Sequence, residues 1–249
     1  MIQLKSEDDI KYIKLAAKIW KEVRDKLIAN TKSGVTTKQL DIIAKDYIEQ
    51  HDATCTFHKY NGFPGYICIS VNDQLIHGIG SNYALKPGDL ITFDIGVTYH
   101  KHVCDSAVSL VVPGKDNPTA EKINQATLQC LNESIKEAVI GNYIGDISNK
   151  IEVVATQNGY EVVRDFTGHG CGNQLHEDPS IPCYGKKHTG AVIVENMVLC
   201  IEPMLLTKTY KYYIDKKNNW TVYANNGLLT CHWEHMILIT KHGPEILTL

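Results

Sequence analysis

Apolar residues recur at helical spacing in two segments near the start of the chain. Residues 7–29 carry one such stripe, preceded by Ser6 as an N-cap with Asp9 in the position of a capping box. We therefore expect an amphipathic helix there, and a second one from Thr36, where Gln39 occupies the same box position. The next apolar runs are rich in β-branched residues and predict strands over 66–71, 90–98 and 103–112.

The second half of the chain repeats this order of helices and strands. Asn117 and Pro118 are typical of a helix start, and the stripe that follows predicts a helix ending at Gly141. A further helix is expected over 146–158. Strands are then predicted over 191–201, around 220–223 and over 234–240.

Two helices followed by strands, twice over, indicate two related halves, 1–114 and 115–249. Residues 115–117 are too short for a linker, so we expect both halves to share one core and form a single catalytic domain. The pattern predicts an α+β fold in which helices pack on one face of a mainly antiparallel sheet.

Composition excludes several classes of protein. The chain has 249 residues, 43% hydrophobic and 21% charged, which is typical of one globular domain rather than a disordered or collagen-like chain. A net charge of -3 argues against a dedicated nucleic-acid binder. We find no apolar signal core at the N-terminus and no run of about 18 apolar residues, so we expect a soluble, cytoplasmic protein without a membrane partner.

The cysteines do not form a zinc-binding pattern. The sequence contains no Cys-x-x-Cys pair, and several cysteines lie within apolar runs. We expect them to be reduced and to pack as small hydrophobic residues. They are Cys55, Cys68, Cys104, Cys130, Cys171, Cys183, Cys200 and Cys231.

Two aspartates interrupt strands that are otherwise apolar. Asp94 and Asp105 lie on the two strands of a predicted hairpin, and a turn centred on Tyr99 and His100 would place them directly opposite each other. Their charges, about 5 Å apart, would repel by roughly 3 kcal/mol at an effective dielectric near 20. A bound cation would convert this repulsion into attraction.

Further candidate ligands lie in the second half. Glu202 and Glu234 stand at the ends of apolar strands, and His169 lies in a glycine-rich loop over 167–172. Taken singly, a carboxylate in a strand more often lies on a solvated face than in a metal site, and a histidine among glycines is more often a turn residue than a ligand. Together with the two aspartates, they provide four negative charges and one imidazole, which would balance two divalent cations.

Other histidines are expected to lie outside the metal shell. His100 and His102 fall at the predicted hairpin turn and should be exposed to solvent. His232 and His235 flank Glu234, and strand alternation should direct His235 away from it.

The ordered set of motifs resembles the methionine aminopeptidases, specifically the short bacterial-style type I form. The resemblance extends from Ser33 to His235. It rests on Asp94 and Asp105, on His169 between two glycines, and on four further segments. These are His77-Gly78-Ile79 after Asn72, His176-Glu177-Asp178-Pro179, Ile201-Glu202-Pro203 and Trp233-Glu234-His235.

The resemblance implies the pita-bread (creatinase/aminopeptidase) fold, with pseudo-symmetric halves and a curved sheet covered by helices. It also implies removal of the initiator methionine from nascent chains. Asp94 would hold one metal ion through both carboxylate oxygens, and Asp105 and Glu234 would bridge two ions. His169 and Glu202 would complete the second site. The ions would be Co²⁺, Mn²⁺, Fe²⁺ or Zn²⁺, and the residues do not select among them.

Three residues would act on the substrate in such an enzyme. Glu202 would carry a proton between water and the leaving amine. His176 would hydrogen-bond the scissile amide or its developing oxyanion, and His77 would guide the leaving nitrogen.

Five residues match the family's pocket for the methionine side chain, where aromatic rings and sulfur suit a thioether. They are Tyr60, Phe63, Cys68, Leu175 and Trp220. Departures from the usual pattern at Phe57, Asn61, Gly80 and Leu175 surround this pocket, and they leave open the preference for the second residue of the substrate.

Rival interpretations remain open at the level of sequence. An Xaa-Pro aminopeptidase or prolidase would use the same ligands but generally has an additional N-terminal domain. A type II methionine aminopeptidase would have a helical insertion. A non-catalytic binding protein of the same fold would have lost ligands that this chain retains. The expected partners are polypeptides that begin with methionine, with possible transient contact to the ribosome.

Overall fold

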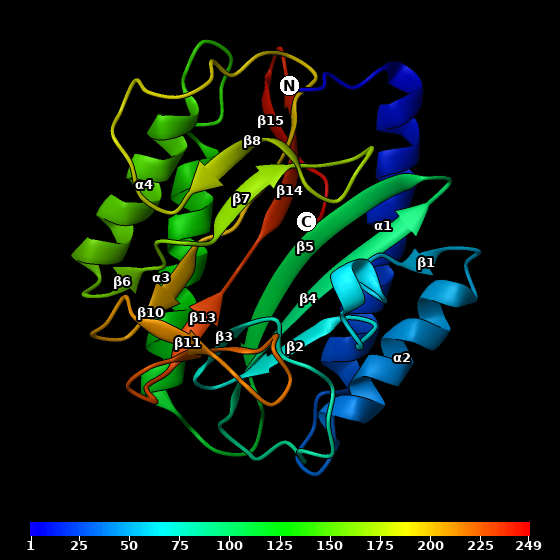
Figure 1. Ribbon diagram of the computed structural model, residues 1–249, viewed down its shortest axis with the longest axis vertical. Coiled ribbons are helices and arrows are strands. Elements are labelled where there is room, and N and C mark those ends of the chain that lie inside the picture. Colours follow the sequence, from blue (N-terminus) through cyan, green and yellow to red (C-terminus); the bar gives the residue numbers. More distant parts are fainter.

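Four α-helices cover antiparallel sheets in the computed structural model, which describes residues 1–249 (Figure 1). Helices α1 (Glu7–Asn30) and α2 (Thr37–Glu49) flank the long hairpin of the first half. Helices α3 (Pro118–Ile135) and α4 (Ile144–Gln157) pack together on the other side of the molecule. All four predicted helices are therefore confirmed.

Capping explains where the helices begin. The Ser6 hydroxyl accepts the Asp9 backbone N–H at 3.1 Å, and the Asp9 carboxylate accepts the Ser6 backbone N–H at 2.9 Å. Helix α4 begins at Ile144, before the predicted start at Asp146, because the Asp146 carboxylate accepts the backbone N–H of Tyr143. The predicted continuation of α3 to Gly141 is wrong: after Ile135 the chain forms tight three-residue turns.

The first sheet is built around two long strands. Strands β4 (Leu90–Tyr99) and β5 (His102–Val111) form a hairpin, and β4 also pairs with β1 (Thr54–Cys55) and β2 (Cys68–Val71). The strands predicted over 90–98 and 103–112 are confirmed. The one predicted over 66–71 begins two residues later, at Cys68.

The register of this hairpin differs from the prediction by two residues. His100 and Lys101 both have positive φ, as in a type I′ turn, so the turn lies one residue further along the chain. Asp94 therefore pairs with Ala107 and Asp105 with Gly96, and the two aspartates are not directly opposite. Since side chains alternate with a period of two, this shift keeps both on one face of the hairpin.

The second sheet has five strands in the order β15-β14-β9-β7-β8. Its strands are β7 (Thr167–Gly170), β8 (Glu177–Pro182), β9 (Val198–Ile201), β14 (His235–Thr240) and β15 (Gly243–Ile246). The strand predicted over 191–201 is much shorter because Asn196 forms a turn with φ +67°.

The glycine-rich segment 167–170, predicted as a loop, is strand β7. Its glycines allow neighbouring strands to approach closely, because a Cβ on Gly168 would lie 2.4 Å from the Cys200 carbonyl oxygen. A Cβ on Gly170 would lie 2.3 Å from the Asp178 carbonyl oxygen. The segment 167–170 is therefore a closely packed strand rather than a loop.

Two small sheets complete the fold. One has the order β13-β10-β6 and the other β11-β12-β3, in which β12 corresponds to the strand predicted around 220–223. Their strands are β3 (Gln74–Ile76), β6 (Glu161–Val162), β10 (Met204–Leu206), β11 (Tyr212–Ile214), β12 (Val222–Ala224) and β13 (Thr230–His232). A short 3₁₀ helix, η1, spans Tyr60–Gly62.

The buried apolar residues form two large clusters that draw on both halves of the chain. Leu75 and Leu90 pack in the cluster beneath α3 and α4, whereas Cys171 and Met236 pack in the cluster beneath α1. All eight cysteines are buried and free, as expected. None of the helices combines the length and apolar character that crossing a membrane would require.

Trp20 joins α1 to the hairpin. Its side chain is fully buried, and its indole N–H donates to the backbone oxygens of Ile95 at 2.8 Å and Ser106 at 3.2 Å.

We predict that Trp20→Phe lowers the free energy of unfolding by about 1–3 kcal/mol, because it leaves buried acceptors without their donor. Urea denaturation would measure this, with the exposed Tyr213→Phe as control. Equal stability of the two variants would contradict the assignment.

Candidate metal centre

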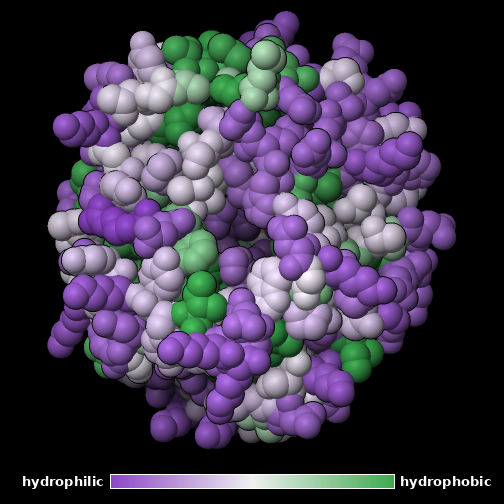
Figure 2. Space-filling view, viewed as in Figure 1, coloured by the Kyte–Doolittle hydropathy of each residue, from purple (hydrophilic) through white to green (hydrophobic).

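A cavity of about 790 Å³ opens between residues from both halves of the chain. The molecular surface is hollowed near the centre of the face seen in Figure 2. All five predicted ligands line this cavity: Asp94, Asp105, His169, Glu202 and Glu234. The fold therefore brings together side chains that are far apart in the sequence.

Strand pairing places each of these side chains. Asp94 and Asp105 come from β4 and β5, and His169 comes from β7. Glu202 directly follows β9, and Glu234 directly precedes β14. The backbone N–H of Glu234 donates to the Ala107 oxygen at 3.0 Å, which fixes the Glu234 segment alongside β5.

The donor atoms are within the range that one small metal centre spans. The His169 Nε2 atom lies 3.7 Å from Asp105 Oδ2 and 3.6 Å from Glu202 Oε1. Ligand atoms of Asp105, His169 and Glu234 all lie within 4.8 Å of one another. The His169 Nδ1 atom contacts the Gly170 carbonyl oxygen at 2.9 Å, which leaves Nε2 facing the carboxylates.

Burial perturbs every titratable group of the set. It raises the pKa of Asp94 to about 7, and it raises the pKa of Glu202 well above its usual value. The pKa values of Asp105 and Glu234 are also raised well above normal, first by burial and then by neighbouring carboxylates. Burial lowers the pKa of His169 to about 4, so its imidazole is neutral and can act as a ligand.

Unpartnered oxygens show that this donor set fits a cation. One buried carboxylate oxygen in each of Asp94, Asp105 and Glu234 has no hydrogen-bond partner. The ion-pair contacts of the four carboxylates are confined to the imidazoles of His169 and His232. Carboxylate oxygens with one imidazole nitrogen are ligands that divalent transition metals accept.

Cys200 also lies within this group of donors, but it is not a suitable ligand. Burial raises the pKa of its thiol well above the usual value, which favours the protonated sulfur in the absence of a metal ion. The thiol instead donates to the Asp105 backbone oxygen at 3.7 Å. Its expected role as a small core residue is consistent with this contact.

His232 faces the carboxylates, which the sequence interpretation did not anticipate. Its side chain is buried, its Nε2 lies 3.5 Å from Glu202 Oε2, and neither ring nitrogen has a hydrogen-bond partner. The available signal was its position two residues before Glu234, which places both on one face of an extended chain. His235 points away, as expected, and its Nδ1 contacts the Thr248 hydroxyl at 2.9 Å.

The two histidines of the predicted hairpin turn do not line the cavity. His100 is exposed, as expected. His102 is not: its ring stacks on Tyr12, and its Nε2 lies 2.9 Å from the Asp9 carboxylate. The expectation of solvent exposure is therefore wrong for His102, because α1 packs beside the tip of the hairpin.

Both accessory histidines line the cavity. The Nδ1 atom of His176 lies 3.0 Å from the Tyr60 hydroxyl, and its ring centre lies 4.5 Å from that of His169. His77 follows β3 with φ +58°, a left-handed conformation that is uncommon outside glycine. Burial lowers the pKa of His77 to about 4, which favours the neutral ring.

The predicted methionine pocket forms one apolar wall of the same cavity. Phe63 and Trp220 meet edge to face, with ring centres 5.2 Å apart. Tyr60, Cys68 and Leu175 also line the cavity, as do Phe57 and Asn61. Gly80, the remaining position that departs from the usual family pattern, does not line the cavity. It packs against Asp41 of α2, where a Cβ on Gly80 would lie 2.9 Å from the Asp41 Cβ.

Phe166 is a cavity residue that the sequence interpretation missed. Its ring lies edge-on to His77 with centres 5.8 Å apart, and it also contacts Tyr212. Phe166 directly precedes β7. Its apolar character was the one feature of the sequence that could have indicated a place in the cavity. Phe166 closes the cavity on the side of His77.

Comparisons with known proteins identify the family of this chain. Residues 11–241 match the model of metallopeptidase family M24. The chain is 38% identical to the methionine aminopeptidase of Mycoplasmoides gallisepticum, over 100% of both chains. It is 40% identical to that of Clostridium acetobutylicum, over 100% of this chain and 99% of the relative.

Solved structures show the same relationship. The crystal structure of methionine aminopeptidase from Rickettsia prowazekii superposes with a TM-score of 0.97, at 33% identity and complete coverage of both chains. The prolidase from Pyrococcus horikoshii superposes with a TM-score of 0.77 at 25% identity, covering 99% of this chain and 63% of that one. The fold is the predicted pita-bread fold, shared by both groups. The chain belongs to metallopeptidase family M24 and, within it, to the methionine aminopeptidases.

Proposed function

We propose that this chain removes the N-terminal methionine from peptides and nascent proteins by hydrolysing their first peptide bond. The observation that carries the proposal is the convergence of four carboxylates, two buried and two partly buried, and one neutral imidazole beside an apolar pocket. The enzyme is a metallo-aminopeptidase that acts as one catalytic domain over residues 1–249.

The ligand set suits two divalent cations, because four carboxylates carry a charge that two such ions balance. Asp94 would hold one ion, His169 and Glu202 would hold the other, and Asp105 and Glu234 would serve both. Co²⁺, Mn²⁺, Fe²⁺ and Zn²⁺ all accept these donors. Bound divalent ions act as Lewis acids toward a peptide carbonyl and lower the pKa of water.

The protein's own residues move the proton and stabilise the developing charge. Glu202 accepts a proton from water on a carboxylate oxygen and delivers it to the leaving amine. The Tyr60 hydroxyl lies 3.0 Å from His176 Nδ1. In the His176 tautomer that carries its proton on Nε2, Tyr60 would donate to Nδ1 and Nε2–H would donate to the substrate carbonyl oxygen. His77, held neutral by burial, also lines the cavity and would guide the leaving nitrogen.

The apolar wall selects the first side chain of the substrate. Phe63 and Trp220 offer ring faces and edges, and the Cys68 thiol adds a polarizable group. A methionine thioether fits such a surface because sulfur interacts favourably with aromatic rings. We place the enzyme in the cytoplasm, where nascent chains emerge, with transient contact to the ribosome and no membrane or nucleic-acid partner.

Metal removal should abolish activity reversibly. We expect chelator-treated protein to cease hydrolysing Met-Ala-Ser, and added Mn²⁺ or Co²⁺ to restore release of free methionine. Gly-Pro should not be cleaved under either condition. Chromatographic quantification of released amino acids would measure this. Cleavage of the proline peptide alone would instead identify an enzyme of the prolidase type, and cleavage of neither would favour a binding protein.

Single substitutions in the ligand set should weaken metal binding. Asp94→Asn and Glu234→Gln should each reduce metal affinity and turnover on the order of 100-fold or more, since each removes a charge beside the ions. Isothermal titration calorimetry would measure affinity, with the exposed Asp116→Asn as control. Unchanged affinity in either ligand variant would contradict the assignment.

His176→Ala tests the role of the accessory histidine. Loss of one donor to a developing oxyanion should lower kcat by about 10²–10³-fold while metal content stays the same. Steady-state kinetics and metal analysis of one preparation would separate the two effects. If the variant loses its metal, His176 is a ligand and the proposed role is wrong.

A further inference from the structure

The N-terminal segment, residues 1–6, runs from α1 toward the sheet that carries His169 (Figure 1). We call these residues the N-terminal strap. The Lys5 ammonium pairs with the Glu177 carboxylate, and both side chains are almost fully buried, at 0% and 4% exposure. The Lys5 backbone N–H donates to the Asn196 oxygen at 2.9 Å. Side-chain and backbone contacts therefore both fix Lys5.

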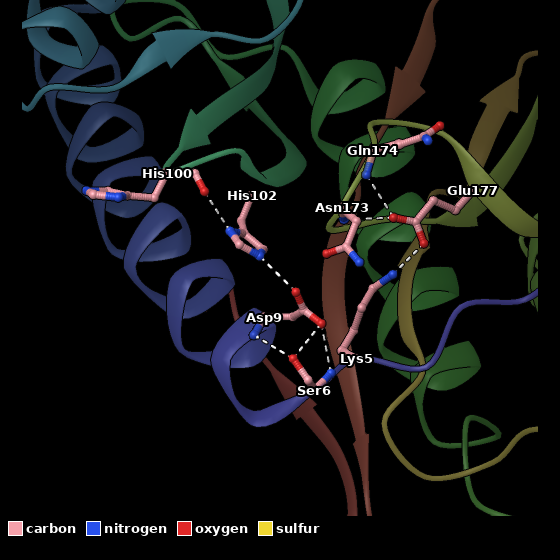
Figure 3. Close-up of polar contacts among 8 residues, drawn as sticks. All are labelled: Lys5, Ser6, Asp9, His100, His102, Asn173, Gln174 and Glu177. Atoms are coloured by element: carbon pink, nitrogen blue, oxygen red, sulfur yellow. Dashed lines mark hydrogen bonds and ion pairs between the residues drawn. The ribbon is translucent and has the colours of Figure 1, made fainter.

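Glu177 in turn holds the loop between β7 and β8, residues 171–176. One of its oxygens accepts the backbone N–H groups of Asn173 at 2.7 Å and Gln174 at 2.8 Å. The other oxygen contacts Lys5, as Figure 3 shows. The next residues of this loop are Leu175 and His176, both of which line the cavity.

The strap lies in direct contact with this loop. Gly172 adopts φ +127°, and a Cβ there would lie 2.9 Å from Lys5 Cε and 2.6 Å from Ile13 Cδ1. The strap also ends in the capping box of Ser6 and Asp9, and Asp9 contacts His102 at 2.9 Å (Figure 3). Lys5 therefore occupies a fixed position between the hairpin and the loop.

A buried ion pair of this kind fixes the positions of its two side chains more than it stabilises the fold. The free-energy cost of removing both charges from water offsets much of their attraction, but loss of one partner leaves an uncompensated buried charge. Helix α1 offers a contrasting pair, Lys14 with Glu245, separated by 2.8 Å and about 45% exposed. Exposed pairs contribute little to stability or order.

We infer that Lys5 is a positioning residue for catalysis, which acts through Glu177 to hold the loop that presents His176 to the substrate. The inference rests on the proposed role of His176. Misplacement of a catalytic group by about 1 Å is enough to slow a reaction by up to about 100-fold. The strap thus orders one loop of the active site, although none of its residues is a candidate metal ligand.

The test compares Lys5→Met, which retains most of the buried stem, with Lys14→Met as the matched control on α1. We expect Lys5→Met to lower kcat on Met-Ala-Ser by about tenfold, with KM and metal affinity within about twofold of the parent. Lys14→Met should leave all three unchanged. Glu177→Gln, which keeps an oxygen for the two backbone N–H groups, provides a second variant should Lys5→Met not fold. It should lower kcat in the same way.

A double-mutant cycle with His176→Ala separates positioning from a general structural role. If Lys5 acts through His176, Lys5→Met should cause no further loss of kcat in the His176→Ala background. Additive losses, or a loss of metal affinity in Lys5→Met, would overturn the inference.

Hydrogen exchange followed by mass spectrometry provides a readout independent of turnover. Lys5→Met should speed exchange at the amides of Asn173 and Gln174 while β7 stays protected. If His176→Ala retains full activity, the role proposed for His176 fails rather than the contact of the strap with the loop. Unchanged exchange at these amides would show that Lys5 does not hold the loop.

Discussion

Four carboxyl groups meet in one cavity, and burial raises the pKa of each, to about 7 for Asp94. No lysine or arginine pairs with these groups. Such a cluster is stable in its ionised form when cations occupy it, because the attraction of divalent ions exceeds the repulsion between neighbouring carboxylates. Metal binding and the ordered geometry of the site are therefore linked.

Strands and the residues next to them position these carboxylates. The strands pack closely because glycines, which have no side chain, lie where they meet. Gly168 lets β7 pack against β9, so that His169 and Glu202 come within 3.6 Å. Pairing of the Glu234 backbone with Ala107 joins the second half to the hairpin of the first. The cavity is thus formed where strands of the two halves meet, and neither half contains a complete site.

Two neutral imidazoles line the substrate side of the cavity, next to the carboxylates of the metal side. Burial lowers the pKa of both His77 and His176, so these rings remain uncharged beside groups that bind cations. A neutral ring donates or accepts one hydrogen bond without repelling a metal ion or a free α-amine. His176 differs in being carried on a loop, whose position depends on Glu177 and on the strap.

The sequence by itself determined the four helices, the long hairpin and the identity of the donor groups, because these depend on local periodicity, capping residues and chemically unusual strand positions. Tertiary structure decided the register of the hairpin, the strand character of 167–170 and the orientation of His232 toward Glu202. It also decided that Lys5 reaches Glu177. Turn conformation, close strand packing and contacts between distant segments depend on the whole fold, and local pattern does not encode them.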